Sequence, residues 1–61
     1  MISSKLIKVV SSFRVSVYDT GFLFECDGWV DELNMSTFRS VATDINGLNA
    51  LITQFMAMPR A

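Results

Sequence analysis

Four carboxylates surround the only tryptophan of the chain: Glu25, Asp27, Asp31 and Glu32 lie on either side of Trp29. Such a cluster could hold a divalent cation, but its spacing lacks the alternating oxygen ligands of a calcium-binding loop. It is also compatible with a solvated turn whose negative charge lies near a helix N-terminus. A third interpretation is an acidic contact for a basic partner protein, because tryptophan is enriched among interface anchors. We expect no metal, and we select Trp29 with these neighbours as the candidate partner-binding site.

Cys26 is the one cysteine that could act as a nucleophile in covalent catalysis, and its neighbours in the sequence argue against that role. Glu25 and Asp27 flank the thiol and raise its pKa, and Cys26 alternates with Phe22 and Phe24 as a buried residue does. The chain has no histidine that could activate a serine or threonine hydroxyl. A chain of 61 residues also leaves little room for a substrate pocket. The sequence therefore predicts a non-enzymatic protein with no catalytic residue and no cofactor.

The charges argue against nucleic acid as the main partner. The formal net charge is −1, whereas nucleic-acid-binding modules usually carry a clear basic surplus. The cations nevertheless gather in the first third of the chain. This segment contains Lys5, Lys8 and Arg14 but a single acidic residue, Asp19. The alternative function is therefore a nucleic-acid-binding regulator that uses a basic N-terminal strand.

An alternation of apolar and polar residues predicts strands in the first half of the chain, over about 5–30. A turn at Asp19-Thr20-Gly21 separates two strands, and the side-chain pattern favours a register with Tyr18 opposite Leu23. This register implies a two- or four-residue loop and sets Arg14 opposite Asp27, an opposite-charge pair. A second turn signal at Asp27-Gly28 leads to a short third strand at Trp29-Val30.

From about residue 35 to 58 the apolar residues recur at three- and four-residue steps, which predicts one long helix. Asn34 is the expected N-cap, with Leu33 and Phe38 packed across it as a hydrophobic staple. Gly47 is the weak point, because a glycine in mid-helix costs about 1 kcal/mol relative to alanine. We expect the helix to continue through Gly47, since the apolar stripe keeps its phase there.

This helical stripe has two interpretations. The simpler one packs the helix across its own sheet; the other uses part of the stripe as a contact with the same helix of a second chain. Asn49 favours the second modestly, because two copies of the amide could bond to each other across a two-fold axis. The expected dimer interface consists of Phe38, Val41, Ile45, Leu48, Asn49, Ile52 and Phe55.

The size and composition favour a partner chain. A domain of 61 residues is marginal as a monomer, one cysteine cannot form an internal disulfide, and 51% of the residues are hydrophobic. We expect a single α+β domain over residues 1–61: an antiparallel hairpin or three-stranded meander followed by one long C-terminal helix, completed by homodimerisation. The predicted function is a regulator or inhibitor that binds a larger intracellular protein. The unpaired cysteine suits a reducing compartment, and we expect a cytoplasmic location and no contact with a membrane.

Overall fold

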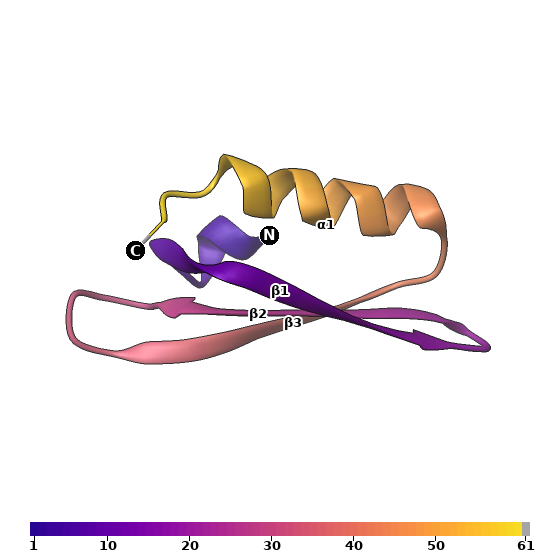
Figure 1. Ribbon diagram of the computed structural model, residues 1–61, viewed down its shortest axis with the longest axis horizontal. Helices are drawn as coiled ribbons and strands as arrows, with labels where there is room; N and C mark the ends of the chain where they lie inside the picture. Colours follow the sequence, from indigo (N-terminus) through magenta and orange to yellow (C-terminus); the bar gives the residue numbers. More distant parts are fainter. Residues whose placement is uncertain (61) are drawn as a thin grey trace.

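In the described residues, three antiparallel strands and one α-helix that lies along their sheet make up the fold (Figure 1). The computed structural model describes residues 1–60 of the chain. The elements are a short 3-10 helix, η1 (Ile2–Ser4), then β1 (Lys8–Tyr18), β2 (Gly21–Trp29), β3 (Met35–Ala42) and α1 (Ile45–Ala57). The strands follow one another in the order β1-β2-β3, and α1 lies on one face of the sheet. The predicted α+β class, with a three-stranded meander before one C-terminal helix, is confirmed.

The β1–β2 hairpin closes through a two-residue loop, with Tyr18 directly opposite Gly21. Gly21 has a φ of +145°, a conformation that side-chain-bearing residues rarely adopt, so the chain needs a glycine there. The predicted pairing of Tyr18 with Leu23 is wrong by two residues. Because a shift of two keeps every side chain on its predicted face, the expected charge pair survives as a diagonal contact between Arg14 and Asp27 at 3.6 Å.

The expected third strand at Trp29-Val30 and the expected helix over 35–58 are both wrong at their boundaries. Trp29 is the last residue of β2, and Met35–Ala42 forms a full third strand with Cys26 opposite Phe38. Pairing with β2 decides the conformation of this segment, because an eight-residue ladder of backbone hydrogen bonds outweighs a helical spacing of apolar residues.

Helix α1 begins ten residues later than expected, and its N-cap is Asp44, not Asn34. The Asp44 carboxylate accepts a hydrogen bond from the backbone N–H of Gly47 at 2.8 Å, as an N-cap side chain does. Gly47 therefore lies in the first turn and not in the middle of the helix. Because Leu33 lies in the loop before β3 and Phe38 within β3, they do not form the expected staple.

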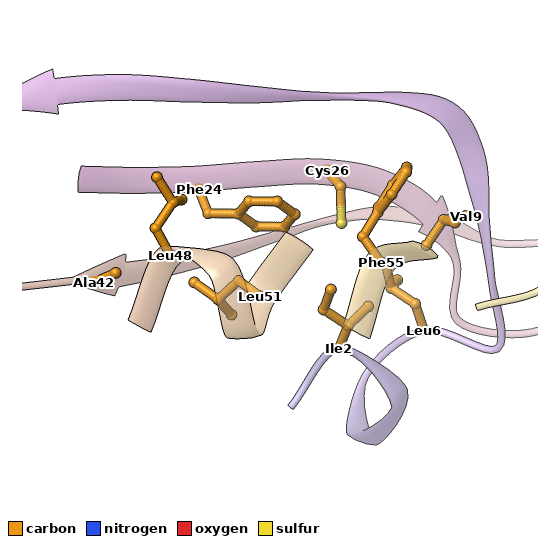
Figure 2. Packing of buried hydrophobic residues seen from close by; sticks show 9 residues of the cluster. All are labelled: Ile2, Leu6, Val9, Phe24, Cys26, Ala42, Leu48, Leu51 and Phe55. Atoms are coloured by element: carbon orange, nitrogen blue, oxygen red, sulfur yellow. The ribbon is translucent and has the colours of Figure 1, made fainter. Parts of the chain in front are cut away.

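The core lies between α1 and the helix-facing side of the sheet (Figure 2). Phe24 and Cys26 of β2 pack against Leu51 and Phe55 of α1, and Phe13 stacks on Phe24 with ring centroids 5.2 Å apart. The remaining buried residues are Ile2, Leu6 and Val9 near the N-terminus, Ala42 at the end of β3 and Leu48 in α1. Since Leu48, Leu51 and Phe55 are buried in this core, most of the apolar side of α1 is used within one chain.

The C-terminal tail reaches the outer edge of β1 at Val9. The backbone N–H of Val9 donates to the carbonyl of Pro59 at 2.9 Å, and Arg60 forms a parallel bridge with Val9. Along residues 1–60 no helix has the length and apolarity that would let it cross a membrane.

Candidate protein-binding surface

The face of the sheet that α1 leaves open carries the predicted site residues of β2. Glu25, Asp27 and Trp29 alternate with Phe24 and Cys26, which are buried beneath the helix. Because successive side chains of a strand point to opposite faces, all three lie on the helix-free face. The structure thus brings Trp29 together with two of its four predicted acidic neighbours.

Both of these carboxylates are paired within the chain. The Nε–H of Arg39 donates to Glu25 at 2.8 Å, and the Thr37 hydroxyl donates to Asp27 at 2.6 Å. That hydrogen bond, helped by the charge of Arg14, holds the pKa of Asp27 below its usual value. With Lys8 on the same face, the cations here outnumber the carboxylates, so the helix-free face is not the acidic surface that the sequence suggested.

Asp31 shapes the loop between β2 and β3. Its carboxylate accepts hydrogen bonds from the backbone N–H groups of Leu33 and Asn34, both at 2.9 Å, and from the Asn34 side chain. The Asn34 amide, with the Leu33 N–H, lowers the pKa of Asp31. A further hydrogen bond from Val30 N–H to the Asn34 carbonyl closes the loop, and Glu32 is exposed within it. Asp31 therefore positions the residues around it instead of offering an open carboxylate.

Apolar side chains gather around Trp29 at this end of the sheet. Met35 is directly opposite Trp29 in the β2–β3 register, and the Lys8 ammonium lies 5.1 Å from the centre of the indole ring. Leu33, at the loop, is 91% exposed. We call the following set the Trp29 surface: Trp29, Leu33 and Met35.

A shallow hollow of about 270 Å³ adjoins this surface, lined by Asp27, Met35, Ser36 and Thr37. Small-molecule sites usually enclose roughly 300–1,000 Å³ of space. The hollow is therefore of a size to accept a side chain from a partner, beside Met35.

Sequence reasoning missed Leu33 and Met35, which it assigned to the start of a helix. The spacing Asp31-Glu32-Leu33-Asn34 could have indicated them, because aspartate and asparagine three residues apart are typical of a turn between strands. A strand beginning at Met35 would then have placed that side chain beside Trp29.

The three N-terminal cations are engaged at separate places. Lys5 donates to the carbonyl of Thr37 on β3 at 2.7 Å, Lys8 lies over Trp29, and Arg14 contacts Asp27. Lys5 is thus at the opposite edge of the sheet from Arg14, with β2 between the two edge strands. This arrangement does not form the single basic track along one strand that a nucleic-acid backbone would follow.

The residues of the predicted dimer interface are divided among three environments. Leu48 and Phe55 are buried in the chain's own core, and Phe38 packs against it. Val41 is exposed on the helix-free face of β3. The other three residues lie along α1, where Ile45 and Asn49 are exposed and Ile52 is half-buried. Of the predicted interface residues, Ile45, Asn49 and Ile52 remain together on a surface, along α1.

Cys26 is fully buried, and desolvation, followed by the charge of Asp27, raises the pKa of its thiol. Within residues 1–60, the His, Cys, Asp and Glu side chains form no group of three or more that could hold a metal ion. Comparisons with models of protein families, with curated proteins and with solved structures found no match for this chain.

Proposed function

We propose that this chain is a non-enzymatic interaction protein, a regulator or inhibitor that acts as a homodimer and binds a larger intracellular protein. The observation that carries the proposal is the Trp29 surface, in which an indole, a thioether and an almost fully exposed leucine lie together at one end of the sheet. Side chains of these types dominate the energetic centres of protein interfaces.

The order of this surface in the free chain supports the proposal. The Lys8 ammonium packs over the Trp29 ring, and the hydrogen bonds that the Asp31 carboxylate accepts fix the loop that carries Leu33. A partner that binds here does not have to immobilise these groups, so less conformational entropy is lost on association. The Trp29 surface is therefore suited to rigid docking.

The chemistry of the surroundings indicates what the partner presents. Glu25 and Asp27 are neutralised within the chain, so a basic partner gains little from them. The hollow beside Met35 instead suits an apolar side chain whose polar neighbours bond to Ser36 or Thr37. We infer a partner with a protruding aliphatic or aromatic residue.

The experiment is affinity capture from a lysate of the cells that make the protein, followed by titration of the captured partner against purified variants. Leu33→Asp is the main variant, because a side chain this exposed adds nothing to the fold. Trp29→Ala tests the indole itself. Val41→Asp is the matched control, since Val41 is 70% exposed on the same face of the sheet, at the far end of β3.

We expect Leu33→Asp and Trp29→Ala to weaken partner binding about tenfold or more, as loss of an interface anchor does. Val41→Asp should bind as the unmodified chain does. Unchanged affinity in both Trp29-surface variants would overturn the proposal. So would a preparation that carries nucleic acid, binds it less tightly as salt rises and loses it on Lys5→Ala.

A further inference from the structure

One edge of the sheet is left open along most of β1. Within residues 1–60, β1 pairs with no strand other than β2, and the C-terminal tail covers its other side at Val9 alone. The pairing is irregular between Val9 and Phe13 and regular from Phe13 to Tyr18. An open, regular strand edge of this kind is a template for pairing with another strand.

The hairpin determines which backbone groups face outward. The residues that flank a two-residue loop, here Tyr18 and Gly21, form a hydrogen-bonded pair, and such pairs alternate along an antiparallel ladder. Arg14 and Ser16 therefore bond to β2. Val15 and Val17 direct their N–H and C=O groups to the open edge, where a second strand can reach them.

Apolar side chains border this edge on the helix side. Val17 is 74% exposed and Val15 is partly exposed, both on the same face of the sheet as Phe24. In a chain of this size, exposed valines on an open edge are a liability unless another surface covers them.

The C-terminal end of one flank of α1 lies near the same edge. Met56 contacts Arg60, the residue that bridges to Val9 of β1. On the opposite flank of the helix Gln54 accepts a hydrogen bond from Ile2 of η1, near the Lys5 contact with β3. The flank that faces the β1 side carries Ile45, Asn49, Ile52 and Met56, at alternating four- and three-residue steps.

The absence of charge on this helix restricts what can cover it. Residues 45–57 contain no Asp, Glu, Lys or Arg, whereas the solvent side of a surface helix usually carries charges. On β1 beyond Val9 the only charged residue is Arg14, which points to the helix-free face and is paired with Asp27. Along Phe13–Tyr18 a second copy of the chain can therefore approach without burying an unpaired charge. Arg60, beside Val9 at the end of this edge, donates to the backbone carbonyls of Phe55 and Met58.

We propose that the homodimer forms along this edge: β1 of one copy pairs antiparallel with β1 of the second, which joins the two sheets into one. An antiparallel pair of identical strands has a two-fold axis, so the contact closes on itself and occupies the β1 edge of both copies. Val15 and Val17 of both copies then fill the space between the two α1 flanks. This inference rests on the homodimer of the proposed function. It places the dimer interface, the seam between the two copies, on the flank of the helical stripe and not at the centre of the stripe.

The proposed contact has to cover a large share of the molecule. A standard interface buries about 800 Å² per partner, which is about a fifth of the 4004 Å² surface of this chain. The open edge of β1 and the adjoining flank of α1 run along the longest dimension of the molecule, 37 Å. The Trp29 surface lies on the other face of the sheet, so one dimer presents two copies of it.

The test measures molar mass by size-exclusion chromatography with light scattering, for the unmodified chain, Val17→Lys and Val41→Lys. Both valines are more than two-thirds exposed on edge strands, but Val41 lies on β3 and on the other face. We expect a two-chain mass for the unmodified chain and for Val41→Lys, and a one-chain mass for Val17→Lys with its circular dichroism unchanged. A one-chain mass for the unmodified chain, or a two-chain mass for Val17→Lys, would overturn the inference.

Amide hydrogen exchange provides a second readout that side-chain effects do not produce. In a monomer the N–H groups of Val15 and Val17 face solvent and exchange rapidly, whereas pairing across the proposed seam protects them. We expect slow amide exchange at residues 15 and 17 of the unmodified chain. In Val17→Lys we expect fast exchange at both positions, including the unchanged Val15. Rapid exchange at both in a two-chain species would place the seam elsewhere. Leu33→Asp should keep the two-chain mass, so loss of partner binding and loss of the dimer are separate results.

Discussion

The Asp44 carboxylate and the Gly47 backbone N–H lie 2.8 Å apart, and their hydrogen bond marks the point where the chain turns from strand to helix. Only two residues, Thr43 and Asp44, separate the end of β3 from the start of α1. The first N–H groups of a helix have no partner within it, so a side-chain acceptor at this position stabilises the turn.

Replacing Asp44 by alanine should therefore lower the free energy of unfolding by about 1 kcal/mol, the usual cost of losing an N-cap acceptor. Asp44→Asn retains an acceptor oxygen and should lose much less. Denaturant unfolding followed by circular dichroism measures both. Equal stability of Asp44→Ala and the unmodified chain would show that this contact does not stabilise the helix start.

The first two strands could be predicted from the sequence because β1 and β2 alternate and their turn has a strong local signal. The predicted register differs from the observed one by two residues, because Arg14 contacts Asp27 without lying directly opposite it. In the structure Arg14 stands opposite Glu25 and reaches Asp27 diagonally. Side-chain pairing decides which face a residue occupies, whereas the two-residue loop decides its opposite neighbour.

The third strand could not be separated from the helix by periodicity, because Phe38, Val41 and Ile45 fit helical spacing equally well. In the structure Phe38 faces the core from β3, while Val41 points to the other side of the sheet. The serines and threonines of this segment favour a strand or a turn over a helix, and Asp44 is a typical N-cap. Those local signals were weaker than the apolar stripe, and the ladder with β2 is a tertiary effect.

The candidate site was predictable in part for the same reason. Glu25, Asp27 and Trp29 share a face because they alternate along one strand, which the sequence indicates. Their neutralisation by Arg39 and Thr37, and the contact of Met35 with the Trp29 end of the sheet, depend on β3. An incorrect assignment of that strand therefore hid both.

Two glycines should respond in opposite directions to alanine. A Cβ at Gly47 would lie 3.4 Å from the Ala42 Cβ and from Asp44 Oδ1, which is ordinary contact, so helix propensity favours Gly47→Ala by about 0.5–1 kcal/mol. A Cβ at Gly28 would overlap the backbone carbonyl oxygen of Lys8, which cannot move without separating β1 from β2. We expect a higher thermal midpoint for Gly47→Ala and a lower one for Gly28→Ala. A shift of the same sign in both variants would contradict this account.

The Cys26 thiol should report on unfolding. It is fully buried, and its raised pKa keeps it protonated at neutral pH, so a thiol reagent should react only after the core opens. Cys26→Ser places a hydroxyl in an apolar site and should cost about 1–3 kcal/mol, whereas Cys26→Ala costs less. Reaction rates at increasing denaturant, measured by absorbance, test the first statement. Fast reaction in the absence of denaturant would disprove it.

The hydrogen bond from Thr37 to Asp27 should make stability depend on acid pH. The folded-state pKa of Asp27 lies below the 3.8 of an unperturbed aspartate, so the folded chain binds fewer protons than the unfolded chain. Its stabilisation is present above about pH 4 and is lost as pH falls through the folded-state pKa. Thr37→Val removes the largest cause of the shift.

We expect Thr37→Val to raise the pKa of Asp27 toward its usual value, measured from carboxyl chemical shifts. Because the Asp27 side chain is 37% exposed and water screens the contact, the loss of stability near neutral pH should be small, about 0.5 kcal/mol. The difference should vanish below the folded-state pKa, where both chains carry a neutral Asp27. Thr53→Val is the control, because its hydroxyl donates to the Asn49 carbonyl and touches no acid. An Asp27 pKa that is the same in Thr37→Val and Thr53→Val would assign the shift to Arg14 instead.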